Sequence, residues 1–455
     1  MRIQDEFLTA AGKIAFDRDY RKKINDNISH YEQALENGLS QYANLELARD
    51  RASFIKWKVI ENLDKYLIEF EASVVRRGGK VLWAIDVQSA QNEIDQILKK
   101  TNAKTIVKSK TMVGEEIGLT DFLRKKNIEV YETDLGDFII DKAGETPFHF
   151  VTPAMQKSRS EIAQLLNEKI GSSLEADETE LSNDVRNELR EKFLQADIGI
   201  TGANFLIAEN GMVSITENEG NARLSFTFAK THIVVAGIEK VIPSLNDLDV
   251  LLPLLSTYST GQKITAYNSV VGPKISADEE SSGDFFVILV DNGRSNLLAQ
   301  GEQRQALQCI KCGACLNSCP VFKTIGGHTY GSVYMGPIGS VTSLHTTESD
   351  SYSHLSFAST LCGKCTDVCP VKIDLHNHLL RNRKDIVNEK TSGTDKILWF
   401  TWKKMMLNRK NLNQGAGVKN FMFKKFFKNA WGERRDFPKL ADKSFNQLWK
   451  EKNSK

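Results

Sequence analysis

The chain has 455 residues, of which 41% are hydrophobic and 26% charged, and its formal net charge is +2. This length allows two or three domains with cores of their own, and the composition is that of an ordinary soluble globular protein. The charged N-terminus, MRIQDEFLTAAGK, argues against a secretory signal, and the longest apolar runs are too short to cross a bilayer. We therefore expect a cytoplasmic protein, with any membrane association peripheral.

The first 75 residues predict helices, because apolar positions recur at helical spacing and no proline interrupts them. Short apolar runs typical of buried strands then alternate with helical segments; the runs lie at 74–86, 105–110 and 128–133, with helices expected over 89–103 and 114–127. Such alternation favours βαβ units, a parallel sheet and right-handed crossovers.

The next segments extend the same pattern. A long polar helical stretch is expected over about 156–195, strands over 196–238, and a last strand within 285–295. The predicted fold class is α/β, with an N-terminal helical region at 1–74 and the α/β domain at 75–300.

All seven cysteines lie between Cys309 and Cys369. An odd number in a reducing compartment indicates metal ligation rather than disulfides. The run CIKCGACLNSCP (309–320) has the C-x2-C-x2-C-x3-C-P spacing of two-cluster ferredoxins, in which the fourth cysteine serves the other cluster. A shorter copy, CGKCTDVCP (362–370), aligns with it from the C-terminal end. Structural zinc sites use paired C-x2-C or Cys/His sets, and this arrangement fits them poorly.

The spacing predicts two [4Fe-4S] clusters with crossed ligands. The first is expected on Cys309, Cys312, Cys315 and Cys369, and the second on Cys319, Cys362 and Cys365. Ser359 stands where an eighth cysteine would be. The second centre is therefore open to three interpretations: a three-iron [3Fe-4S] cluster, a four-iron cluster with water or substrate on one iron, or a non-cysteine fourth ligand. A serine alkoxide is a poor match for iron beside sulfide.

The surroundings of the cysteines look helical. Forty-two residues separate Cys319 from Cys362, and both flanks have helical patterns, so that 301–385 resembles the α-helical ferredoxin domains of succinate dehydrogenase and heterodisulfide reductase subunits. The last segment, 386–455, is basic and aromatic. Residues 381–455 hold 20 Lys/Arg against 7 Asp/Glu. We expect this segment to dock an acidic partner subunit; an anionic membrane surface or a merely solvated face stay open, and nucleic acid is not expected.

Several stretches together carry a resemblance to a family, namely KSKTMVGEEIGL (108–119), ETDLGDFIID (132–141), NEGNARL (218–224), VDNGRSNLLA (290–299) and LCGKCTDVCPVKIDLHNHLLRNR (361–383). With the first cysteine motif, they resemble the lactate utilization protein B family. The resemblance implies a lactate-utilization (LUD) domain over 75–300, similar in fold to the ribose-phosphate isomerase and CoA-transferase group, and two [4Fe-4S] clusters. It also implies an electron-transfer role in a complex that oxidises L-lactate to pyruvate, with other subunits and an electron acceptor of unknown identity.

Two alternatives for the function remain. Ala-Glu-Asn-Gly at 208–211 is similar to the turn in which CoA-transferases hold a nucleophilic glutamate, so Glu209 is a candidate for acyl transfer, although a plain polar turn explains it as well. The same electron-transfer role could also serve another 2-hydroxy acid. Nearby polar residues could line a small-molecule pocket or only cap strand ends; they are Glu217, Asn218, Glu219 and Asn221. No G-x-G-x-x-G follows a predicted strand, which argues against hydride chemistry.

Overall fold

The computed structural model describes residues 3–273, 284–346, 351–390, 393–413, 416–422, 425, 439 and 441–453. The chain divides into two compact units, Met1–Arg383 and Lys384–Lys455, which are described separately. The first unit begins with helices, as the sequence predicts, and they number four: α1 (Ile3–Ile14), α2 (Arg18–Leu39), α3 (Leu45–Ile60) and α4 (Leu63–Arg76). Side chains cap two of them, because Asp17 accepts the Tyr20 N–H at 2.9 Å and Asn44 accepts the Leu47 N–H at 3.0 Å.

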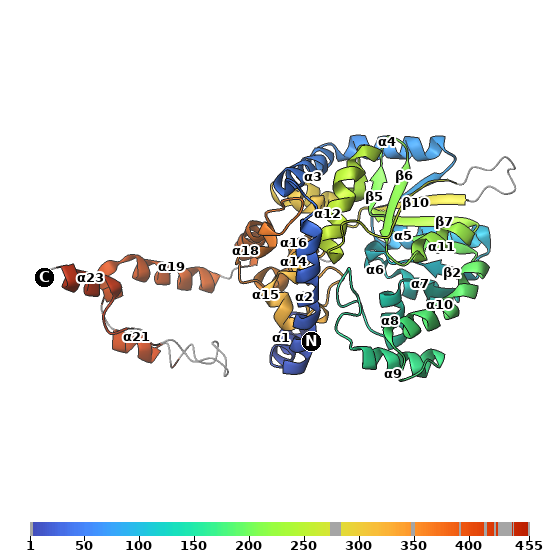
Figure 1. Cartoon of the computed structure of the whole chain (residues 1–455). Coiled ribbons are helices and arrows are strands. Elements are labelled where there is room, and N and C mark those ends of the chain that lie inside the picture. The colour runs from blue at the N-terminus through green and yellow to red at the C-terminus, as the bar shows by residue number, and fades with distance from the viewer. Residues whose placement is uncertain are drawn as a thin grey trace. The chain divides into compact units, whose positions relative to one another are not determined.

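A six-stranded parallel sheet forms the centre of the first unit, as the alternation of apolar runs and helical segments predicts (Figure 1). Its strands, in spatial order, are β1 (Lys80–Ala84), β10 (Asp284–Val290), β7 (Thr231–Gly237), β4 (Ile198–Thr201), β2 (Thr105–Lys108) and β3 (Glu129–Glu132). The continuous apolar runs of β7 and β10 are buried along almost their whole length. Strands of this kind need cover on both faces of the sheet.

Helices supply that cover on each face. Side chains of α5 (Val87–Thr101) and α7 (Leu119–Lys125) pack in one core with alternate residues of the sheet, such as Ile106 and Ile288. The residues between them point to the opposite face, where Val287 packs with α4. On that same opposite face, Val107 packs with α8 (Leu135–Ala143), α9 (Arg159–Ile170) and α10 (Glu178–Gln195).

Three local expectations are corrected by the structure. The helix expected over 114–127 is two helices, α6 (Met112–Glu116) and α7, because Gly118 adopts a φ of +60° between them. The helical stretch 156–195 is likewise two helices, α9 and α10. The strands expected over 196–238 are interrupted by α11 (Asn221–Phe228). Both oxygens of the Glu217 carboxylate accept amides of its first turn, from Ala222 at 2.7 Å and Arg223 at 2.8 Å. A carboxylate at this end of a helix stabilises it.

A smaller sheet lies beside the first, and its strand order is β8 (Val241–Ile242), β5 (Phe205–Ile207), β6 (Met212–Glu217) and β9 (Tyr267–Val271). Strands β5 and β6 form a hairpin whose turn is residues 208–211. Helix α12 (Leu248–Thr260) follows β8 and packs against α2 and α3. The sequence patterns did not predict this second sheet as a separate element.

From residue 294 to residue 390 every described element is helical, which agrees with the predicted α-helical ferredoxin domain. The elements are α13 (Arg294–Leu298), η4 (Gln303–Gln308), α14 (Ala314–Asn317), α15 (Pro320–Ile325), η5 (His328–Tyr330), α16 (Gly336–Thr346), η6 (Ser353–Phe357), α17 (Lys364–Asp367) and α18 (Leu375–Lys390). Figure 1 shows α2 beside α15. One apolar core accordingly joins Ile24 and Ile28 of α2 to Phe322 of α15.

The second unit contains α19 (Gly393–Leu407), α20 (Arg409–Asn413), α21 (Ala416–Met422) and α23 (Phe445–Asn453). Aromatic side chains are exposed on α19, including Trp399 and Phe400. Part of the predicted basic aromatic segment 386–455, including most of FMFKKFFKNAW (421–431), lies outside the described residues. Among the residues that are described, no helix is both long and apolar enough to span a bilayer.

Candidate functional site

The two cysteine loops have the same backbone geometry. Lys311 in the first loop and Leu361 in the second both have a positive φ, of +61° and +55°. Two residues later, Gly313 and Gly363 have φ values of +80° and +81°, and each precedes a one-turn helix, α14 or α17. Left-handed backbone at a non-glycine residue is uncommon and costs free energy. Its repetition at matched positions shows that the two loops are structural copies, aligned as the shared Cys-Pro ends indicate.

The similarity of the two loops includes Ser359, which stands where an eighth cysteine would be. The Lys311 N–H donates to Cys309 Sγ at 3.4 Å, and the Leu361 N–H donates to Ser359 Oγ at 3.1 Å. The Ser359 hydroxyl therefore occupies, in the second loop, the place that the Cys309 thiol occupies in the first.

The fold gathers the seven thiols into two groups that interact electrostatically. The first group comprises Cys309, Cys312, Cys315 and Cys369. The second comprises Cys319, Cys362 and Cys365, and it adjoins the first through Cys315 and Cys365. Cluster binding by these two sets remains a prediction.

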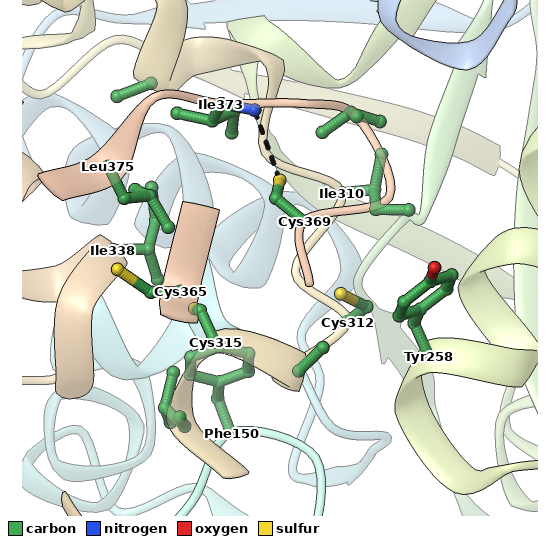
Figure 2. Close-up of a cluster of buried hydrophobic side chains, with 14 of the residues drawn as sticks. Phe150, Tyr258, Ile310, Cys312, Cys315, Ile338, Cys365, Cys369, Ile373 and Leu375 are labelled. Atoms are coloured by element: carbon green, nitrogen blue, oxygen red, sulfur yellow. Dashed lines mark hydrogen bonds between the residues drawn. The ribbon is translucent and has the colours of Figure 1, made fainter. Parts of the chain in front are cut away.

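The surroundings of the thiols suit an iron–sulfur cofactor. None of the seven forms a disulfide, and five lie in the apolar core that joins the N-terminal helices to the ferredoxin segment (Figure 2). Burial raises the pKa of Cys369 to about 11 and that of Cys365 to about 12, so neither thiol is prepared for nucleophilic chemistry. Backbone amides face the sulfurs, as the Ile373 N–H does toward Cys369 Sγ at 3.4 Å. Such donors tune thiolate-bound clusters.

The donor set suits iron–sulfur ligation by its chemistry. All seven candidate donors are free thiols, and thiolates are the usual ligands of iron–sulfur clusters. Among the described residues, no three Cys, His, Asp or Glu side chains are arranged to hold a single metal ion.

The two groups of thiols differ in exposure. In the first group Cys312, Cys315 and Cys369 are buried, and Cys309 is half-buried. In the second group Cys362 is exposed. The second group therefore reaches the protein surface, while the first lies deeper in the core.

A cavity of about 370 Å³ lies beside the first loop, at the carboxyl ends of the parallel strands. This edge of an open parallel sheet is where ligands commonly bind. The cavity is bordered by the segment after β2, by the segment after β4, and by Lys240, Lys311 and Tyr334. The four polar residues that the sequence offered either as pocket lining or as strand caps all line it, namely Glu217, Asn218, Glu219 and Asn221.

These four residues also hydrogen-bond to neighbouring parts of the fold. They therefore both line the cavity and stabilise the local structure. Glu217 caps α11, and Glu219 Oε2 accepts the Leu135 N–H at 2.9 Å. Burial, reinforced by the nearby Asp134, raises the pKa of Glu219 to about 7. The cavity wall is thus a mixture of carboxylates, amides and hydroxyls held in place by the backbone.

A buried ion network adjoins this cavity through Tyr334. Arg294 donates to Glu116 Oε2 at 2.8 Å and to Glu239 Oε2 at 2.6 Å, and all three side chains are at least 95% buried. Tyr334, which lines the cavity, also donates to Glu116, at 2.7 Å. Burial works to raise the pKa of Glu239, but the cations Arg294, Lys311 and Lys240 together outweigh it and bring that pKa to about 2.

Comparison with known proteins agrees with these two parts of the structure. Residues 67–290 match the LUD domain family, and residues 305–373 match the 4Fe-4S dicluster domain family. Lactate utilization protein B of Bacillus cytotoxicus is 42% identical over 387 residues, which cover 85% of this chain and 79% of that protein. The chain belongs to the lactate utilization protein B family. The protein of the same name from Bacillus thuringiensis is 41% identical over the same shares of both chains.

One solved structure was also similar, a DUF162 family protein from Deinococcus radiodurans. It is 12% identical, with a TM-score of 0.28 over 50% of this chain and 98% of that one.

Glu209, the candidate nucleophile, lies in the β5–β6 turn and is exposed. Its Oε1 accepts the Leu245 N–H at 2.7 Å, and its backbone N–H donates to the Pro243 carbonyl at 3.1 Å. It is not among the residues that line the 370 Å³ cavity. The structure thus gives Glu209 a role in holding the turn, and its part in acyl transfer remains a prediction.

The sequence analysis missed Lys240. It is the last residue of η1 (Ile238–Lys240), the short helix that follows β7, and the residue is only 8% exposed. The one signal was its place beside Glu239 in the largely apolar run at 232–242, where charged residues are unusual. The pattern did not show that the ammonium borders a cavity, because the other walls come from distant segments.

Proposed function

We propose that this chain is the iron–sulfur electron-transfer subunit of a complex that oxidises L-lactate to pyruvate. The observation that carries the proposal is the pair of structurally equivalent loops, which bring seven free thiols into two adjoining groups. The membership of the lactate utilization protein B family supports the substrate, and the match to the 4Fe-4S dicluster domain supports the cofactor.

In this proposal two thiolate sets hold two clusters. The first set is Cys309, Cys312, Cys315 and Cys369, and the second is Cys319, Cys362 and Cys365. When bound, clusters of this class accept and release single electrons. The chain's own contribution is to keep water from the first set with an apolar core and to aim amide N–H groups at the sulfurs.

Exposure of Cys362 supports a role for the second set in meeting a redox partner, because electron transfer needs close approach. The Lys364 side chain beside it is also exposed and favours an acidic partner surface. The net charge of +13 in residues 381–455, from 20 Lys/Arg and 7 Asp/Glu, supports contact with other subunits of the system.

The experiment compares two variants in a reconstituted complex. Cys365→Ser removes a predicted cluster ligand, and we expect it to lower lactate oxidation at least tenfold together with the iron content. Glu209→Ala removes the candidate nucleophile of the acyl-transfer alternative, and we expect turnover within twofold of wild type, because its carboxylate only bonds a turn amide. Loss of turnover in Glu209→Ala with normal iron content and normal reduction would favour acyl transfer instead.

A panel of 2-hydroxy acids tests the substrate. The proposal predicts that L-lactate gives the highest kcat/KM in the reconstituted complex. A different 2-hydroxy acid that is turned over more efficiently would keep the electron-transfer role and replace lactate.

A further inference from the structure

Lys240 brings an ammonium group to the wall of the cavity. The residue is 92% buried, and no hydrogen bond or ion pair joins its ammonium to a residue in the described ranges, although Glu239 and Cys309 attract it electrostatically. Its neighbour in sequence, Glu239, is already paired with Arg294 at 2.6 Å. Lysine is almost never buried without a direct partner, because a buried ammonium loses its hydration, and the attraction of Glu239 and Cys309 replaces that hydration only in part. A cation in this position is explained if an anion from outside the chain enters the cavity.

The electrostatic surroundings of Lys240 strengthen this reading. Four cations interact at this end of the cavity, against two carboxylates and the sulfur of Cys309; the cations are Lys56, Lys240, Arg294 and Lys311, and the carboxylates are Glu116 and Glu239. Lys56 already donates a hydrogen bond to the Glu239 carbonyl at 2.6 Å, and Arg294 is already paired with the two carboxylates. The remaining net charge is therefore carried by Lys240 and Lys311, which both line the cavity.

Lys311 is held in position from the other side. Its ammonium lies 3.9 Å from the centre of the Tyr334 ring, and Tyr334 is in turn bonded to Glu116 at 2.7 Å. A cation over an aromatic face keeps much of its charge available to a second partner. Lys311 also belongs to the first cysteine loop, between Cys309 and Cys312. An anion between the two lysines would accordingly lie next to the first group of thiols.

The rest of the cavity determines the chemistry of the ligand. Beyond the lysines its wall presents the neutral hydrogen-bonding groups of Asn204, Thr216 and Asn221, together with carboxyl groups. These carboxyl groups, which belong to Asp134, Glu217 and Glu219, can accept a hydrogen bond from a ligand hydroxyl and leave the lysines as the place for an anionic end. A volume of about 370 Å³ is at the low end for small-molecule sites. These features suit a compact ligand with one anionic end and one hydroxyl or keto group, and they disfavour a nucleotide or a coenzyme.

We propose that this cavity binds a small 2-hydroxy or 2-oxo monocarboxylate, with its carboxylate between Lys240 and Lys311 and its oxygen function toward the amide and hydroxyl wall. This inference extends the proposed function, since it places a lactate-class anion against the first cysteine loop. The observations behind it are Lys240 and the cavity, however, so that ligand binding can be measured without electron transfer.

The test is direct binding to the anaerobically purified full chain, measured by calorimetry. We expect L-lactate and pyruvate to bind saturably, and propionate, which lacks the second oxygen function, to bind at least tenfold more weakly. Lys240→Met should weaken lactate binding at least tenfold, whereas Lys169→Met, an exposed lysine of α9, should leave it within twofold. Inorganic phosphate is tested as a second anion. If phosphate binds and neither L-lactate nor pyruvate does, the proposed class of ligand is wrong.

Thermal unfolding separates a ligand site from a merely structural lysine. Removing an unpaired buried charge should leave the melting midpoint of Lys240→Met unchanged or higher in the absence of ligand, and the rise in midpoint produced by lactate should disappear. A lower midpoint without ligand, or lactate binding equal to that of wild type, would overturn the proposal.

Iron content and reduction by dithionite are measured on the same samples. A chain that holds iron but binds no carboxylate contradicts this inference alone. A chain that binds lactate but holds no iron contradicts the proposed function and leaves the site in place.

Discussion

Arg294 is a guanidinium enclosed by protein, and it is stable there because two carboxylates share it. Burial would raise the pKa of Glu116, but Arg294 lowers it below its ordinary value by pairing with both oxygens at 2.8 Å. The network also fixes Tyr334 and, through it, the position of Lys311. The Arg294 side chain thus links Glu116 and Glu239 directly, and through Glu116 and Tyr334 it also positions Lys311 in the first cysteine loop.

Replacing Arg294 by Met should destabilise the chain strongly, because Glu116 and Glu239 would be left buried without a cation. Breaking a buried pair in this way typically costs about 3 to 5 kcal/mol. We expect a loss of this size in denaturant unfolding, against less than about 0.5 kcal/mol for the exposed control Arg159→Met. A loss no larger than that of the control would show that the network contributes little.

Ser359 offers a second test at the scale of one residue. Its hydroxyl takes the place that Cys309 Sγ has in the other loop, so Ser359→Cys should supply a fourth thiolate to the second set without disturbing the fold. After brief exposure to air, we expect the variant to retain about eight irons and the wild type about seven, since a cluster corner without a protein ligand is the easier one to lose.

EPR of the oxidised samples makes the comparison. The signal of a three-iron centre should be present in the wild type and much reduced in Ser359→Cys, and Ser182→Cys on α10 serves as the control. Identical spectra and iron contents in all three would contradict the assignment of this position.

At the scale of elements, α9 is joined to α2 by a surface ion pair. Lys23 Nζ lies 2.7 Å from Glu161 Oε1, and Glu161 also closes the capping box of α9 with Ser158. The hydrogen bond from Lys23, followed by that from the Ser158 amide, lowers the pKa of Glu161 to about 2. A depressed carboxyl pKa contributes stability above the ordinary pKa of about 4.5, and that contribution is lost as the pH falls toward 2.

Lys23→Met should therefore lower the melting midpoint slightly at pH 7, with a free-energy change below about 1 kcal/mol because both side chains are more than a third exposed. The difference from wild type should shrink as the pH is lowered below 4.5. Thermal unfolding at a series of pH values measures it. A difference that stays constant or grows at acid pH would mean that Lys23 acts through packing rather than charge.

The same elements show what the sequence could and could not predict. The strands of the parallel sheet were predictable because their apolar runs are continuous and local, as in β7 and β10. Helix α11 was not, because Phe226, Thr227 and Phe228 favour strands, and the carboxylate of Glu217 that caps the helix acts through tertiary geometry. The break at Gly118 shows the opposite case, in which one residue able to adopt positive φ ends a regular pattern.

At the scale of the whole molecule, the two candidate sites differ in how far they can be predicted. The cysteine loops are short, and their spacing alone gave the loop equivalence that the backbone shows. The cavity is assembled from residues between Ser109 and Tyr334, so no local pattern reveals it. The apolar core that holds most of the cysteines likewise draws on residues from Ile24 to Leu379. The N-terminal helices are thus part of the structure around the cysteines.

The most direct test of this account is the inorganic content of the full chain purified without oxygen. Iron and acid-labile sulfide are quantified, and EPR is recorded before and after reduction with dithionite. The account predicts a brown protein with about eight irons and as many sulfides per chain, or about seven irons if the second centre holds three, and a new signal on reduction. Colourless protein that takes up no electron, or that carries one or two tightly bound zinc ions, would contradict it.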